Sequence, residues 1–114
     1  MDNIVREKSF RFAVRIVKLC KYLRETKKET VMSRQLLRAG TSIGANVAES
    51  EHAQSRPDFL SKMNIALKEA AETDYWLRLC YETAYISANE FRSIIADCRE
   101  LESILASIVK TTKQ

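Results

Sequence analysis

Hydrophobic residues recur at intervals of three and four along most of the chain, the spacing that gathers side chains on one face of an α-helix. Four segments with this pattern are separated by short polar stretches, and they predict helices over residues 3–27, 31–52, 57–83 and 88–111. Short connections make consecutive helices antiparallel neighbours. The pattern therefore predicts an all-α fold, an up-and-down antiparallel four-helix bundle that forms a single domain over residues 1–114.

Each predicted helix has one apolar stripe that faces the core. The predicted core residues are Val5, Phe12, Ile16, Leu19, Leu23, Met32, Leu36, Gly40, Ile43, Val47, Phe59, Met63, Ala66, Ala70, Thr73, Leu77, Cys80, Phe91, Ile94, Cys98, Leu101, Leu105 and Ile108. Gly40 and Gly44 lie on or beside the second stripe, although glycine costs roughly 1 kcal/mol against alanine inside a helix. Their presence predicts that a neighbouring helix approaches closely there.

Polar residues mark the turns between the helices. Residues 25–30 are charged or polar without any apolar side chain, which predicts the first turn. Ser55, Pro57 and Asp58 have the order of a helix start, with a serine cap, a proline in the first turn and an acid near the positive helix end. Ser87 and Glu90 have the spacing of a capping box, which predicts the start of the last helix.

The first and third helices carry more apolar surface than one core needs. Phe10, Val14 and Val17 lie roughly opposite the core stripe of the first helix, where a monomeric bundle normally presents charges to water. Trp76 falls on a secondary stripe of the third helix, together with the carboxylates of Glu69 and Glu72. We interpret both sets as oligomer-interface residues, because tryptophan is enriched at interfaces.

The sequence also allows a second interpretation of Trp76 on the third helix. Trp76 can fill the core of a monomer if the third helix lies deep in the bundle. Buried acids need partners such as arginine, and Arg34 and Arg38 of the second helix are candidates to meet Glu69 or Glu72.

Composition narrows the class of protein. The chain has two glycines, one proline and three cysteines, with no CxxC pair and no N-terminal stretch that resembles a secretory signal. We therefore expect a cytoplasmic protein. No apolar run approaches the roughly 20 residues that span a bilayer, so we expect no membrane role.

Charge is distributed unevenly along the chain. Residues 1–57 carry 12 Lys and Arg against 6 Asp and Glu, whereas residues 58–114 carry 7 against 9. Lys8, Arg11, Arg15 and Lys18 form one continuous stripe on the first helix, a pattern that can follow the phosphates of nucleic acid. The alternative is a solvated helix face, since no interleaved exposed aromatic residue offers a stacking platform.

One short motif has the form of a metal site. Glu49 and His52 match the Glu-x-x-His motif of ferritin-like bundles, but His52 is the only histidine, so a complete di-iron site needs residues from several subunits. A metal-dependent oxidoreductase with a Glu49/His52 site shared between subunits is therefore the alternative function. Otherwise the sequence contains no recognisable catalytic motif. We predict a non-catalytic protein without a cofactor, a resident metal or an evident small-molecule substrate.

Two stretches carry a family resemblance: TSIGANVAE at residues 41–49 and LKEAAETDYWL at residues 67–77. Together they resemble the bacterial four-helix bundle protein family, which includes the rRNA intervening-sequence proteins and is related to Avd, the accessory protein of diversity-generating retroelements. The resemblance implies a barrel-like homopentamer, with RNA and a reverse transcriptase as partners in the retroelement branch. The family's signature positions fall on Ser42, Gly44, Asn46, Glu49, Glu69, Glu72, Tyr75 and Trp76. We interpret these as packing and assembly residues.

Overall fold

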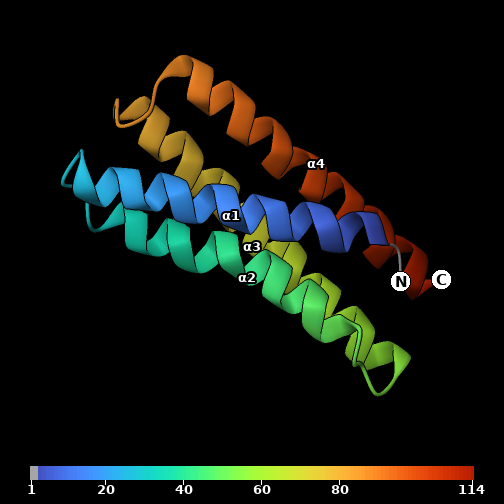
Figure 1. Cartoon of the computed structure of the whole chain (residues 1–114). Helices are drawn as coiled ribbons and strands as arrows, with labels where there is room; N and C mark the ends of the chain where they lie inside the picture. The colour runs from blue at the N-terminus through green and yellow to red at the C-terminus, as the bar shows by residue number, and fades with distance from the viewer. Residues whose placement is uncertain (1–2) are drawn as a thin grey trace.

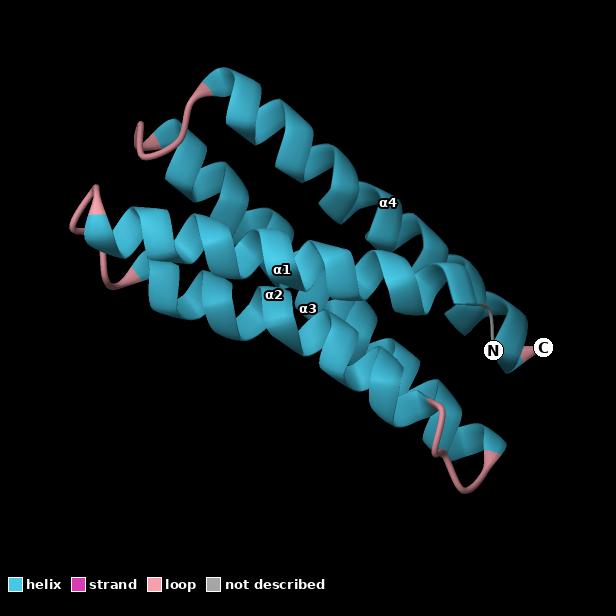
Figure 2. Cartoon of the chain, in the orientation of Figure 1, coloured by secondary structure: helices cyan, strands magenta, loops and turns pink. Residues whose placement is uncertain are grey.

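Four α-helices run through residues 3–114, the part of the chain that the computed structural model describes. They are α1 (Asn3–Glu25), α2 (Met32–Ser50), α3 (Arg56–Glu82) and α4 (Ala88–Lys113). Consecutive helices run antiparallel and are joined by short turns (Figure 1), and strands are absent from the described residues (Figure 2). The bundle extends 44 Å along its length and about 20 Å across. These features confirm the predicted all-α four-helix bundle.

The core lies along the bundle axis and is made of the predicted stripes. Among the largest fully buried side chains are Phe12, Leu36, Met63 and Leu101, one from each helix. Three predicted core residues, Met32, Phe59 and Phe91, are only partly buried because they lie near helix ends. At the C-terminal end of α4, Val109 is buried, whereas the predicted Ile108 is partly buried.

The first turn lies where it was predicted, but the end of α1 differs from its prediction. α1 ends at Glu25 rather than at residue 27, because Lys28 adopts a left-handed backbone conformation (φ 58°) that ends the helix. The Glu29 N–H then donates to the Leu23 carbonyl at 2.9 Å, which closes a helix C-cap. α2 similarly ends at Ser50 rather than at residue 52, and the His52 N–H donates to the Glu49 carbonyl at 3.0 Å in a tight turn.

Buried Glu29 caps α2, a role that the sequence pattern did not reveal. Its carboxylate accepts hydrogen bonds from the backbone N–H groups of Val31, Met32 and Ser33 at 3.1, 3.0 and 2.8 Å. Burial raises the pKa of this carboxyl, but the backbone donors lower it more, so the net pKa is below its ordinary value. The polar first turn is thus folded back onto the helix that follows it.

The predicted serine caps are present at α3 and α4. Ser55 Oγ accepts from the Asp58 N–H at 3.2 Å, and Ser87 Oγ accepts from the Glu90 N–H at 3.1 Å. Glu90 does not complete a reciprocal capping box among the bonds of the described residues. Its carboxylate instead lies 3.6 Å from Arg15 of α1. A tertiary ion pair has therefore replaced the predicted local contact.

α1 and α3 are diagonal in the bundle, and the contact between α1 and α4 is smaller than those between the other neighbouring helices. α1 packs against α2 and α4, and α3 packs against the same two helices. The turn between α1 and α2 and the turn between α3 and α4 lie at one end, and the start of α1 and the end of α4 lie at the other (Figure 1). Across residues 3–114, none of the helices combines the length and apolarity that a membrane crossing requires.

Candidate oligomer and nucleic-acid interfaces

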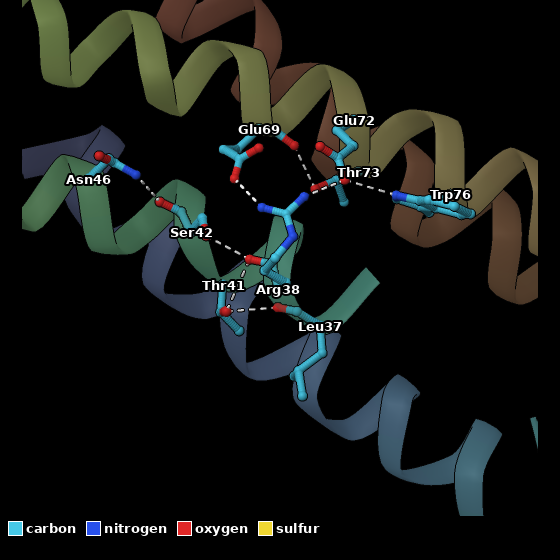
Figure 3. Close-up of polar contacts among 9 residues, drawn as sticks. All are labelled: Leu37, Arg38, Thr41, Ser42, Asn46, Glu69, Glu72, Thr73 and Trp76. Carbon is cyan, nitrogen blue, oxygen red and sulfur yellow. Dashed lines mark hydrogen bonds and ion pairs between the residues drawn. The ribbon is translucent and has the colours of Figure 1, made fainter. Parts of the chain in front are cut away.

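A polar cluster joins α2 to α3 through one guanidinium group. Arg38 of α2 donates to Glu69 Oε2 at 2.8 Å and also forms an ion pair with Glu72, both on α3 (Figure 3). The Trp76 indole N–H donates to the same Glu72 carboxylate at 3.0 Å. The Glu69 side chain is only 9% exposed, so Arg38 neutralises an acid that is almost removed from water.

This cluster changes the interpretation of the predicted Trp76 interface. Glu69, Glu72 and partly buried Trp76 are already bonded within one chain, and of the two candidate arginines it is Arg38 that holds them. Arg34 is exposed and forms no ion pair with the described residues. Tyr75 packs edge-on against Trp76 with 5.1 Å between ring centroids, and it remains about half exposed. The interface role of this face stays a prediction, with Tyr75 as its exposed aromatic group.

The signature residues of α2 mainly stabilise their own helix and its packing. Ser42 Oγ donates to the Arg38 carbonyl at 2.6 Å, and the Asn46 side-chain amide donates to the Ser42 carbonyl at 2.8 Å (Figure 3). A Cβ at Gly44 would lie 3.2 Å from the backbone oxygen of Ser9. The small residue therefore allows the backbones of α1 and α2 to approach closely, as the sequence predicted.

The apolar residues of α1 outside the core are exposed to solvent. Phe10 is 69% exposed, Val14 39% and Val17 47%. They lie at helical spacing, and we call them the α1 stripe. Exposed apolar residues that occur singly are ordinary, whereas these three lie together on one helix face, and their role as an interface stays a prediction.

A second exposed apolar face lies on α3. Ile65 and Tyr75 are exposed on it, and a shallow hollow of about 500 Å³ is lined by residues that include Pro57, Leu60 and Ile65. We call this the α3 face. Because α1 and α3 are diagonal in the bundle, the α1 stripe and the α3 face lie on opposite sides of the molecule.

Much of the predicted basic stripe is paired within the chain. Lys8 contacts Glu100 at 3.0 Å, and Arg15 contacts Asp97 at 2.8 Å, so the stripe forms part of the seam between α1 and α4. Arg11 lies 3.8 Å from Glu7 on its own helix. Lys18 is the one predicted residue that makes no ion pair within residues 3–114. Of the four predicted residues, only Lys18 therefore keeps a charge without an ion-pair partner among the described residues.

A group of cations without an ion pair lies at the end of the bundle where α1 turns into α2. Residues 18–34 contain six Lys and Arg against two acids, a net charge of +4 that equals the net charge of the whole chain. All six cations are exposed, and none forms an ion pair with another described residue. One of the two acids, Glu29, is buried under its cap bonds. We call this surface the basic end; it comprises Lys18, Lys21, Arg24, Lys27, Lys28 and Arg34.

An exposed aromatic residue does accompany these cations, contrary to the expectation from the sequence. Tyr22 is exposed one turn after Lys18, and both line a cleft of about 600 Å³ between α1 and the start of α4. The floor of the cleft includes the buried side chains of Leu19 and Ile86. The prediction from sequence missed Tyr22. Its position between helices keeps it out of the core, and the spacing of residues along α1 does not reveal that position.

Glu49 and His52 do not belong to a group of three or more possible metal ligands within the described residues of one chain, and the site shared between subunits stays a prediction. The Glu49 carboxylate accepts from Lys62 Nζ at 3.1 Å, and His52 lies in the exposed turn after α2. The described residues do contain a cluster of possible ligands, Asp74, Cys98 and Glu102, but it lies between α3 and α4. Arg78 and Arg99 already contact both oxygens of Asp74, at 2.8 and 3.2 Å. This donor set is therefore arranged for guanidinium groups rather than for a metal ion.

The three cysteines are buried and free. Burial raises the pKa of Cys20 to about 12 and that of Cys80 to about 11, and it raises the pKa of Cys98 further still. A thiol with a raised pKa is protonated near neutral pH and is a poor nucleophile. The cysteines thus act as small hydrophobic core residues.

Comparison with known proteins supports the family resemblance. Residues 1–107 match the family described as 23S rRNA-intervening sequence protein. A crystal structure of a protein of unknown function from the S23 ribosomal protein family of Bacteroides thetaiotaomicron VPI-5482 has 57% sequence identity and a TM-score of 0.94, covering 96% of this chain and 97% of that one. No functionally curated protein matches the chain. The chain belongs to the 23S rRNA intervening-sequence protein family.

Proposed function

We propose that this protein is a non-catalytic, homo-oligomeric interaction scaffold. The observation that carries the proposal is the exposed α1 stripe of Phe10, Val14 and Val17. Its apolar side chains gain free energy when another surface removes them from water, at roughly 25 cal/mol for each Å² of apolar area. A second copy of the chain carries an apolar surface that can cover this stripe, and it is present at the same concentration as the first.

The positions of the two exposed apolar surfaces favour a ring. The α1 stripe and the α3 face lie on opposite sides of one molecule, so a single two-fold interface cannot cover both. Contact between the α1 stripe of one copy and the α3 face of the next covers both, and such head-to-tail contacts close into a ring when the rotation permits. The homopentamer implied by the family resemblance is one such ring.

The expected result in light scattering is a mass several times the chain mass of 13.1 kDa at micromolar concentration, with five chains for the pentamer. Phe10→Glu places a charge in the α1 stripe, and Ile65→Glu places one in the α3 face. Each variant is expected to lose the ring, because burying an unpaired carboxylate is unfavourable. Ser107→Glu adds the same charge at an exposed position of α4 and is expected to keep it.

Mixing the two variants tests the head-to-tail arrangement directly. Phe10→Glu keeps an intact α3 face and Ile65→Glu keeps an intact α1 stripe, so an equal mixture should form a one-to-one complex. If two α1 stripes contact each other instead, Ile65→Glu should assemble like the wild type. Mixing it with Phe10→Glu should then produce no additional complex. A wild-type protein that remains a monomer would overturn the proposal as a whole.

The basic end favours a second role for the scaffold, which is binding of RNA. Six exposed cations without partners offer phosphate contacts, and neutralised phosphates release counterions. Tyr22 beside Lys18 adds an aromatic face on which an unpaired base can stack. The paired residues Lys8 and Arg15 are less available, because the carboxylates of α4 already hold them.

The RNA role predicts binding that weakens steeply as salt rises. The double variant Lys21→Gln and Lys27→Gln should bind structured RNA more weakly, and the slope of log affinity against log salt should fall by roughly 0.7 to 0.9 for each lost contact. The matched control, Lys110→Gln and Lys113→Gln, removes the same charge at the opposite end of the bundle. Absence of binding at about 50 mM salt, or equal losses in both double variants, would contradict an RNA site at the basic end.

A further inference from the structure

Two carboxyl groups face each other across the seam between α3 and α4. Asp74 lies on α3 and Glu102 on α4, and an oxygen of each lies within 4.8 Å of the other and of the Cys98 sulfur. The Asp74 side chain is 12% exposed and Glu102 is partly buried. Cys98 closes the inner side of the pair and donates to the Ala70 carbonyl at 3.4 Å.

The positive charge near this pair is concentrated on Asp74. Arg78 Nε lies 2.8 Å from one Asp74 oxygen, and Arg99 Nε lies 3.2 Å from the other. Within residues 3–114, neither arginine forms an ion pair with Glu102. Asp74 is therefore stabilised as a carboxylate, whereas Glu102 faces that carboxylate from a partly buried position.

Two carboxylates this close cannot both be charged without strong repulsion, and one proton between them removes it. The titratable and charged groups that act on the pair in the described chain come from α3 and α4: Arg78, Cys98 and Arg99, besides the pair itself. Burial, followed by the hydrogen bond to Asp74 and its charge, raises the pKa of Glu102 to about 7. Burial also opposes the charge of Asp74, but its hydrogen bonds to Glu102, Arg99 and Arg78 bring its pKa below the ordinary value.

We propose that Asp74 and Glu102 share one proton across the α3–α4 seam, and that release of this proton loosens the packing of α4 on α3. The proton belongs to Glu102, which donates it to the Asp74 carboxylate. When it leaves, the hydrogen bond is lost and two negative charges face each other beside buried Cys98. The inference does not depend on oligomer formation or on RNA binding.

The direction of the pH effect follows from the raised pKa of Glu102. The folded protein holds this proton above the ordinary glutamate pKa of 4.5, at which an unfolded chain releases it. The stabilisation is therefore complete below pH 4.5 and is lost as the pH rises to about 7. The pKa values of Glu29, Glu72 and Asp74 are lowered, so these groups affect stability at lower pH. The change in stability between pH 5 and 7.5 therefore reports on Glu102.

The direct test is a carbon NMR titration of the carboxyl groups in labelled protein, with Glu102→Gln used to assign the signal. We expect the Glu102 carboxyl to titrate near pH 7. Hydrogen exchange then tests the loosening: backbone amides of α3 and α4 near the pair should open about tenfold more often at pH 7.5 than at pH 5, after correction for intrinsic rates. Amides in the α1–α2 seam should not change.

Glu102→Gln keeps the shape and the hydrogen bond of the protonated acid, and it should abolish this pH dependence. Glu100→Gln, which changes an exposed acid of α4 that contacts Lys8, is the matched control and should retain it. A Glu102 signal that titrates near pH 4.5, or equal pH dependence in Glu102→Gln and the wild type, would overturn the proposal. The titration of the wild-type protein decides the question even if a variant does not fold.

Discussion

Replacing Gly40 with alanine is expected to lower the free energy of unfolding by about 2 kcal/mol. The new Cβ would lie 2.7 Å from Ile16 Cγ1 and 2.8 Å from Cγ2, closer than non-bonded carbon atoms can approach. Ile16 is fully buried, and both of these atoms are attached directly to its Cβ, so the side chain cannot swing aside. α1 and α2 must separate instead. Such overpacking lowers the free energy of unfolding by roughly 3 kcal/mol, whereas the better helix propensity of alanine raises it by roughly 1 kcal/mol.

Chemical denaturation of the variants measures this effect, and a double-mutant cycle supplies its control. Ile16→Ala removes the two atoms that clash, at its own cost of roughly 2 to 5 kcal/mol. In that background Gly40→Ala should become stabilising, because the methyl group then fills space and improves the helix. If Gly40→Ala stabilises the otherwise unchanged protein, the close approach of α1 and α2 at this position is wrong.

Replacing Arg38 with alanine is expected to destabilise the protein by about 2 kcal/mol. The substitution leaves Glu69, whose side chain is 9% exposed, without the cation that neutralises it. Breaking a buried ion pair costs roughly 3 to 5 kcal/mol, but the Arg38 side chain is 51% exposed, so solvent screening reduces that figure. Trp76 should also become more mobile, because Arg38 helps to fix its acceptor, Glu72.

Thermal or denaturant unfolding checks this result against Arg34→Ala as the control. Arg34 lies one turn earlier on α2, is exposed and forms no ion pair within residues 3–114, so its removal should change stability little. Glu69→Gln in the Arg38→Ala background should recover part of the loss, because it removes the buried charge. Equal effects of Arg34→Ala and Arg38→Ala would contradict the assigned role of the cluster.

Acid should reduce the effect of Arg38→Ala. The hydrogen bond from Trp76 and then that from Arg38 lower the pKa of Glu72. The stability that this carboxylate contributes is therefore present above its ordinary pKa of 4.5 and is lost as the pH falls through the lowered value. The difference between the wild type and the variant should accordingly shrink in strongly acidic solution.

The helices and the core could be predicted because the forces that specify them act over a few residues. A helix repeats every 3.6 residues, so the spacing of residues such as Phe12 and Ile16 already places them on one face. The serine caps at Ser55 and Ser87 bond backbone groups only three residues away. The end of α1 could not be predicted to the residue, because it depends on the left-handed conformation of Lys28 and on the return of Glu29 to cap α2.

Which charges of the candidate surfaces are paired could be determined only from the tertiary structure. The sequence placed Lys8, Arg11, Arg15 and Lys18 on one face of α1, but it did not reveal that Lys8 meets Glu100 across 92 positions of the chain. The rotation and axial position of α4 against α1 decide that contact. The cations at the basic end form no ion pair with a described residue, although Glu90 lines the same cleft as Lys18, and the spacing along α1 does not show this either.

The sequence by itself determined four amphipathic helices, their order, the composition of their core and the surplus apolar residues Phe10, Val14 and Val17. These follow from local periodicity and from the physical need to remove apolar side chains from water. Only the tertiary structure decided that the α1 stripe and the α3 face lie on opposite sides, that Arg38 holds Glu69 and Glu72 within one chain, and that Asp74 meets Glu102. Each of these depends on how whole helices are rotated and aligned against one another, which no spacing along a single helix specifies.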